Sequence, residues 1–124
     1  MKPRGLTKVD IVIQNNVYWD DAFQYGMPED QTWNFNGMSF LLDIKQHEDD
    51  VNPLLSLNST GGTIVVADPI NRILNMYVTD LTIRAALPLG QYVYDLIMVN
   101  NSTGERDALM YGELFVVQGV TLEG

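Results

Sequence analysis

The clearest pattern along the chain is an alternation of apolar and polar side chains with a period of two residues. Successive side chains of a β-strand point to opposite faces, so this period predicts strands that each turn one apolar face to a core. Five segments carry the pattern best, and their expected core-facing residues are Val9, Ile11 and Ile13; Met38, Phe40, Leu42 and Ile44; Leu74, Met76 and Val78; Tyr92, Tyr94, Leu96 and Met98; and Met110, Gly112, Leu114 and Val116. Three weaker segments at residues 18–25, 54–58 and 63–67 bring the expected total to about eight strands.

Runs of Gly, Asn, Asp, Ser and Pro separate these segments, as expected for the turns of a β-rich fold. Residues 79–87 depart from the alternation and are followed by Pro88. Because Thr79 or Asp80 can cap a helical turn, this stretch predicts a short helical crossover from one sheet to another. Many short strands with turns between them predict an all-β sandwich or barrel.

The hairpin near the C-terminus carries apolar side chains on both faces. The residues opposite its expected core face include Val93, Ile97, Val99, Leu109, Tyr111, Phe115 and Val117. An exposed apolar patch of this size usually marks an interface with another molecule. The alternative is that both faces of the hairpin are covered within this domain.

Size and composition fit one folded domain. The chain has 124 residues, of which 46% are hydrophobic, and it has no cysteine. The lack of cysteine excludes a disulfide framework and a thiol nucleophile. No apolar run is long enough to span a bilayer, and no signal-like stretch follows the N-terminus. We therefore expect no membrane association, and a location in the cytosol or in a particle assembled there.

The net charge of −9 is unevenly distributed. Residues 1–8 carry Lys2, Arg4 and Lys8 and no acidic side chain. We interpret them as a basic N-terminal arm that docks on an acidic neighbour, or as a frayed end, before a single domain at residues 9–122. The acidic remainder would repel a phosphate backbone, so we expect no nucleic-acid partner.

Few residues suggest chemistry. The single histidine, His47, stands beside Glu48, Asp49 and Asp50 in an expected loop, where a solvated side chain is the ordinary case. The acidic clusters do not follow the spaced calcium-loop pattern, although loops from different strands could converge on an ion. No nucleophile–base set or phosphate-binding motif is present. We expect no enzymatic activity, no cofactor and no metal.

Two tryptophans leave three interpretations open. Trp19 and Trp33 lie near expected loops. They could plug the ends of a sandwich core, anchor a protein interface or form a platform on which sugars stack.

The last third of the chain carries a more specific pattern. Residues 90–96 read G-Q-Y-V-Y-D-L, residues 109–117 read L-M-Y-G-E-L-F-V-V, and G-V-T follows at 119–121. This resembles small bacteriophage virion proteins, whose chains end with a G-x-Y-x-Y-D-L strand, a turn, and an L-x-x-G-x-x-x-V strand closed by V-T. The chain is also similar to the N-terminal domain of phage baseplate upper proteins. It has N-F-N-G at residues 34–37, where the group often has L-T-G.

The resemblance implies an immunoglobulin-like sandwich with a role in tails, baseplates, fibre adaptors or capsid decoration. Tyr92 resembles the tyrosine that pins a corner of such sandwiches, with its ring in the core and its hydroxyl bonded to the backbone. Tyr94 and Asp95 belong to the same motif. Gly90 suits a place where a side chain would clash, and Gly112 in mid-strand predicts a bulge or a close neighbour.

These observations together predict a two-sheet, antiparallel, immunoglobulin-like β-sandwich that serves as a structural protein of a phage particle. Its expected partners are other virion proteins of the capsid, neck, tail or fibre, and further copies of itself. The residues expected at interfaces are Lys2, Arg4, Lys8, Trp19, Val93, Ile97, Tyr111 and Phe115. The alternative function is a carbohydrate-binding module for attachment to a host surface.

Overall fold

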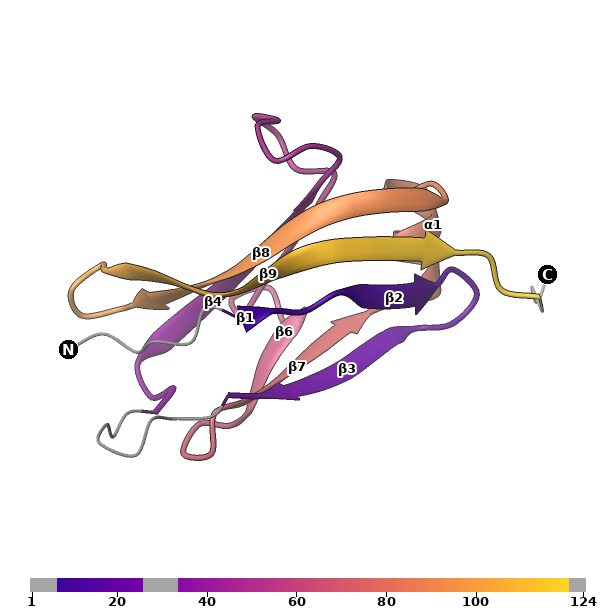
Figure 1. The fold of residues 1–124 in the computed structure, drawn as a ribbon. Helices are drawn as coiled ribbons and strands as arrows, with labels where there is room; N and C mark the ends of the chain where they lie inside the picture. The colour runs from indigo at the N-terminus through magenta and orange to yellow at the C-terminus, as the bar shows by residue number, and fades with distance from the viewer. Residues whose placement is uncertain (1–6, 26–33, 121–124) are drawn as a thin grey trace.

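A computed structural model describes residues 7–25 and 34–120, which form nine β-strands and one short helix (Figure 1). The strands are β1 (Thr7–Lys8), β2 (Ile11–Gln14), β3 (Trp19–Gln24), β4 (Met38–Lys45), β5 (Leu55–Asn58), β6 (Ile64–Asp68), β7 (Ile73–Val78), β8 (Gly90–Asn100) and β9 (Arg106–Val117). The helix α1 spans Asp80–Ala86. The predicted strands and the predicted crossover are all present.

The strands form two sheets, as expected for a sandwich. The larger sheet has six strands in the order β1-β9-β8-β4-β5, with β2 also paired to β9. The smaller sheet has the order β3-β7-β6. Figure 1 shows the long strands β8 and β9 in one layer and β3 with β7 in the other. The fold is therefore an all-β two-sheet sandwich.

One expectation about the sheets is corrected. The sandwich is not wholly antiparallel, because β1 and β2 both pair with β9 in parallel. Thr7 and Lys8 pair with Met110 and Tyr111, so the end of the expected basic arm at residues 1–8 is a sheet strand. The first six residues lie outside the described part of the chain.

The predicted alternation places the core between the two sheets. Phe40, Leu42, Leu74, Met76 and Leu96 have no exposed surface, and the other core-facing residues of these strands are also largely buried. Apolar burial of this kind is the main favourable contribution to folding. The core positions predicted from the period of two are thus confirmed for β2, β4, β7, β8 and most of β9.

The helix α1 carries the chain from β7 in the smaller sheet to β8 in the larger one. Thr79 caps it, because its hydroxyl accepts the N–H of Thr82. Ile83 packs into the core. Arg84 donates to Asp80, and also to the carbonyl of Asn15 at 2.7 Å, which fixes the helix against the loop after β2. No helix in residues 7–25 and 34–120 is long and apolar enough to cross a membrane.

Candidate functional site

The side of the larger sheet that points away from the core is the most distinctive surface of the molecule, and we call it the outer face. The smaller sheet packs against the opposite side (Figure 1). The side chains that define the outer face are Lys8, Asp10, Val12, Leu41, Asp43, Lys45, Gln91, Val93, Asp95, Ile97, Val99, Tyr111, Glu113, Phe115 and Val117.

Apolar side chains cover much of the outer face. Val12 is 63% exposed, Tyr111 is 42% exposed and Val117 is 40% exposed. Val93, Ile97, Val99 and Phe115 are half-buried, because neighbouring side chains on the same face cover part of each. Val93, Ile97, Tyr111 and Phe115, which the sequence suggested as interface residues, therefore lie together on one surface.

Leu109 is the exception, and the expectation that it points outward is wrong. Leu109 is only 1% exposed, and its neighbour Met110 is also buried, at 2% exposed. The register of β8 against β9 shifts here, with Leu96 opposite Met110 but Ile97 opposite Ala108. A β-bulge of this kind inserts one extra residue, so two consecutive side chains can turn to the same side.

Charged groups form two rows across the outer face. In the first row, strand pairing places Lys8 opposite Tyr111, Tyr111 opposite Asp95, and Asp95 opposite Asp43. Ser56 on β5 follows, and its hydroxyl donates to Asp43 at 2.7 Å. The row therefore runs from a cation at one edge to two facing carboxylates at the other.

The second row lies one step along the strands. Here Lys45 is opposite Val93, and Val93 is opposite Glu113. Asp10 stands next to Glu113, because its carboxylate accepts the Glu113 N–H at 3.0 Å. This row runs in the reverse sense, with its anions beside the N-terminal strands and its cation on β4.

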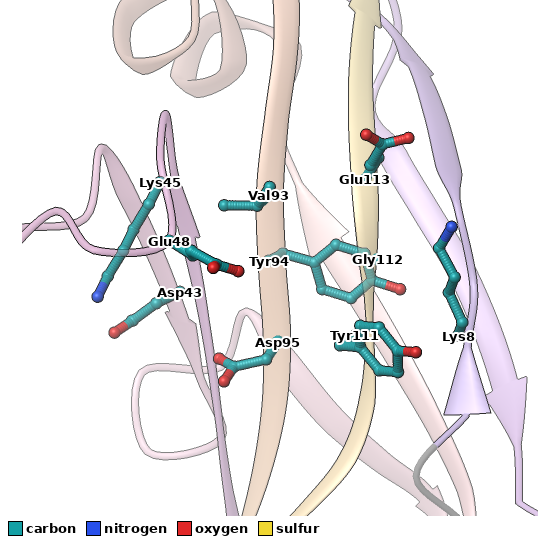
Figure 2. Close-up of a pocket in the computed structure, with 10 residues that line it drawn as sticks. All are labelled: Lys8, Asp43, Lys45, Glu48, Val93, Tyr94, Asp95, Tyr111, Gly112 and Glu113. Atoms are coloured by element: carbon teal, nitrogen blue, oxygen red, sulfur yellow. The ribbon is translucent and has the colours of Figure 1, made fainter.

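A hollow of about 360 Å³ opens between these two rows. Val93 and Gly112 line it together with Tyr94, and Figure 2 shows the charged side chains and Tyr111 around it. Glu48, from the loop after β4, completes the lining. The hollow is thus an open, mixed-charge depression in the middle of the outer face.

The pKa of Asp95 is raised from its ordinary value of 3.8. Partial desolvation is the larger cause, and the facing carboxylate of Asp43 adds to it. Lys45 and Arg106 act in the opposite direction. Like charges directly opposite each other destabilise a sheet, so this pair favours a cation or a hydrogen-bond donor from a binding partner.

Two of the motif residues fix the corner before β8. The Tyr92 ring is buried, and its hydroxyl donates to the carbonyl of Pro88, four residues upstream. This is the contact expected of a corner tyrosine. Gly90 has φ +155°, and a Cβ added there would meet nothing closer than 3.8 Å. The positive φ therefore explains why glycine stands at this position. The expected steric clash does not occur.

The other two motif residues hold the N-terminal strands. A Cβ on Gly112 would lie 2.2 Å from the Val9 carbonyl oxygen, so a close neighbour requires this glycine. The Tyr94 hydroxyl donates to the same carbonyl from inside the core. Val9 also donates its N–H to Tyr111 at 2.8 Å. Together these contacts fix the junction of β1 and β2 against β9.

Trp19 does not lie on an interface, contrary to one of its interpretations. Its ring is 3% exposed, and the indole N–H donates to Asp21 at 2.9 Å. It is a core residue at the start of β3, and it offers no free face to a sugar or a partner. Trp33, Lys2 and Arg4 lie outside the described residues, whereas Lys8 lies on the outer face beside the hollow.

The acidic and histidine side chains of the described residues form no metal site. Among residues 7–25 and 34–120, no group of three or more His, Asp or Glu side chains could hold a metal ion. His47 is exposed in the loop after β4, and its backbone N–H donates to Asp50 at 3.0 Å.

The facing pair Asp43 and Asp95 was not anticipated from the sequence. The two residues are 52 positions apart, and only the register of β4 against β8 brings them together. Comparison of the sequence with models of known protein families finds no match. Comparison with curated proteins likewise finds no significant match.

Proposed function

We propose that this protein is a structural component of a bacteriophage particle, and that it acts through protein–protein contacts made by its outer face. The observation that carries the proposal is the group of apolar side chains on this face, Val93, Ile97, Phe115 and Val117, beside the exposed Tyr111. Soluble monomers rarely expose a large apolar patch to water, and aromatic residues are enriched in interface cores.

The proposal of a bacteriophage role rests on the sequence resemblance as well as on this surface. The motif residues Gly90, Tyr92, Tyr94 and Gly112 all have structural roles in the corner or in the N-terminal junction. They would therefore mark a shared scaffold, and the binding surface would be carried by the residues between them. Tails, baseplates, fibre adaptors and decorated capsids are all places where such a small adaptor domain would serve.

The carbohydrate-binding alternative has less support. It named Trp19 and Trp33 as the stacking residues, and Trp19 is buried. The proposed adaptor role needs no catalysis.

The proposal is tested on particles produced by the genome that encodes this chain. Quantitative mass spectrometry of purified particles should find the chain in several copies, and immunogold labelling should locate it. The variant Phe115→Asp should fold but be left out of the particle. Val65→Asp, on the exposed β6 strand of the smaller sheet, is the matched control and should still be incorporated. Homogeneous particles that lack the native chain would contradict the proposal.

A further inference from the structure

We propose that the partner seated on the outer face is a second copy of this chain, and that the two copies pack face to face about a two-fold axis running between β8 and β9, parallel to the strands. This inference extends the proposed function, and it rests on that proposal only in taking the outer face as the binding surface. The order of charges in the two rows points to this arrangement.

A two-fold axis along the strands leaves each row at its own level and reverses its order from edge to edge. In the first row, Lys8 of one copy then lies over Asp43 of the other, at both ends of the row. Tyr111 lies over the other copy's Asp95. The cation at one edge thus meets the carboxylate pair at the other edge, and the phenol hydroxyl meets a carboxylate that can accept its hydrogen bond.

The second row matches under the same operation. Lys45 of one copy lies over Asp10 of the other, because β4 and the N-terminal strands exchange places. Glu113 lies over Val93, within reach of the other copy's Lys45. Another axis along the strands does not do this, because an axis between β4 and β8 would place Asp95 of one copy over Asp43 of the other. The agreement of two independent rows on one axis favours a self-complementary face.

The positions of the basic side chains agree with a second copy on the outer face. Of the four basic residues after Lys8, Arg72 and Arg84 bond to groups of their own chain. The other two, Lys45 and Arg106, stand on the larger sheet, as does Lys8. In a chain with a net charge of −9, Lys8 and Lys45 both stand on the outer face, which also carries the apolar patch.

The overlap of the two faces is large enough for a weak dimer. The axis overlaps four strand positions, because β5 lies beyond the other copy, and four strands about 4.8 Å apart and about 26 Å long present roughly 500 Å² per copy. Both copies together would then bury about 1,000 Å², which is about the minimum for a specific interface. The hollow gives the Tyr111 ring of the other copy room to enter toward Asp95.

Charge exchange at one contact tests this arrangement. Lys8→Asp and Asp43→Lys each place like charges at both ends of the first row, so each should raise the dimer dissociation constant about tenfold to a hundredfold. The double variant Lys8→Asp/Asp43→Lys keeps the wild-type net charge and should restore dimerisation. Analytical ultracentrifugation over a concentration series measures all four proteins, and circular dichroism checks that each is folded.

Three results would overturn the inference: a wild-type chain that stays monomeric at about 100 μM, single variants that dimerise like the wild type, or a double variant that does not recover. The proposed function fails separately. A monomeric chain whose outer-face variants are left out of particles would leave the adaptor role intact and remove the second copy. A chain that dimerises but is absent from particles would support the second copy and contradict the adaptor role.

Discussion

The two faces of strands β8 and β9 differ, although the same backbone supports both. On the inner face, Tyr92, Tyr94, Leu96 and Met98 are each no more than 4% exposed. On the outer face, Val93 and Ile97 stand among carboxylates and lysines. The two sides of one strand thus differ in burial, so neighbouring residues in sequence should respond differently to substitution.

The largest contrast is expected between Leu96 and Ile97, which are adjacent on β8. Leu96→Ala should lower the free energy of unfolding by about 3 kcal/mol, because it leaves a cavity in a closed core. Ile97→Ala should cost only about 1 kcal/mol, since its side chain is half-buried. Urea unfolding at low protein concentration measures both. Equal losses would mean that this chain covers its own outer face.

Gly112 should tolerate substitution poorly, because its inner-face position has no room even for a methyl group. Gly112→Ala should cost about 2 kcal/mol or more, since the new Cβ must displace the Val9 backbone. Amide exchange in β2 should accelerate. Gly104→Ala is the control: a Cβ there meets nothing within 4 Å, and only its φ of +79° is unfavourable, at about 1 kcal/mol. A smaller effect at Gly112 than at Gly104 would contradict the crowding.

The two tyrosines at positions 92 and 111 should differ in the same way. Tyr92→Phe removes the hydroxyl that donates to Pro88 and should cost about 1 kcal/mol. Tyr111→Phe removes an exposed hydroxyl and should stay within about 0.5 kcal/mol of the native value. Thermal unfolding resolves the two. If both variants unfold alike, the hydroxyl of Tyr92 does not stabilise the corner.

The smallest effect is expected from Asp43→Asn. Because the pKa of Asp95 is raised in the folded chain, the folded state holds this proton more tightly than the unfolded state. The contribution of Asp95 to stability therefore falls as the pH rises from 3.8 through the raised folded pKa. Removing the Asp43 charge should reduce that fall and stabilise the chain at neutral pH by about 0.5 kcal/mol.

Urea unfolding between about pH 3 and pH 7 measures this difference. Asp49→Asn, which changes an exposed acid in the loop after β4, is the control and should leave the fall unchanged. An identical pH dependence in the native chain and in Asp43→Asn would show that the two carboxylates do not interact.

Local alternation was sufficient to predict the strands and most of the core. Side-chain direction has a period of two wherever a strand is regular, so Phe40, Leu42 and Leu74 could be assigned to the core without knowing their partners. The same rule failed at Leu109, because a bulge breaks the period and leaves no mark in the composition of β9. Phe35 lies in the turn before β4, where no alternation marks its direction, and it is 2% exposed and packs against Phe40.

The outer face was predicted only in part. Its apolar residues on β8 and β9 follow from alternation, but its charged rows depend on which strands are neighbours and in which register. The parallel pairing of β1 with β9 brings Lys8 beside Tyr111 across about a hundred residues of sequence. Nothing local to either residue specifies that contact, so the facing carboxylates and the hollow emerge only from the folded arrangement.

Because β1 and β2 join the larger sheet, the smaller sheet ends at β3, whose far side pairs with no strand in the described chain. An unpaired edge strand can pair with a strand of another chain and lead to aggregation, and proteins commonly protect such edges with charges. Asp20 and Asp21 stand in the middle of β3, and Asp21 holds the Trp19 indole. At high local concentration, this edge is thereby protected against pairing with a strand of another molecule.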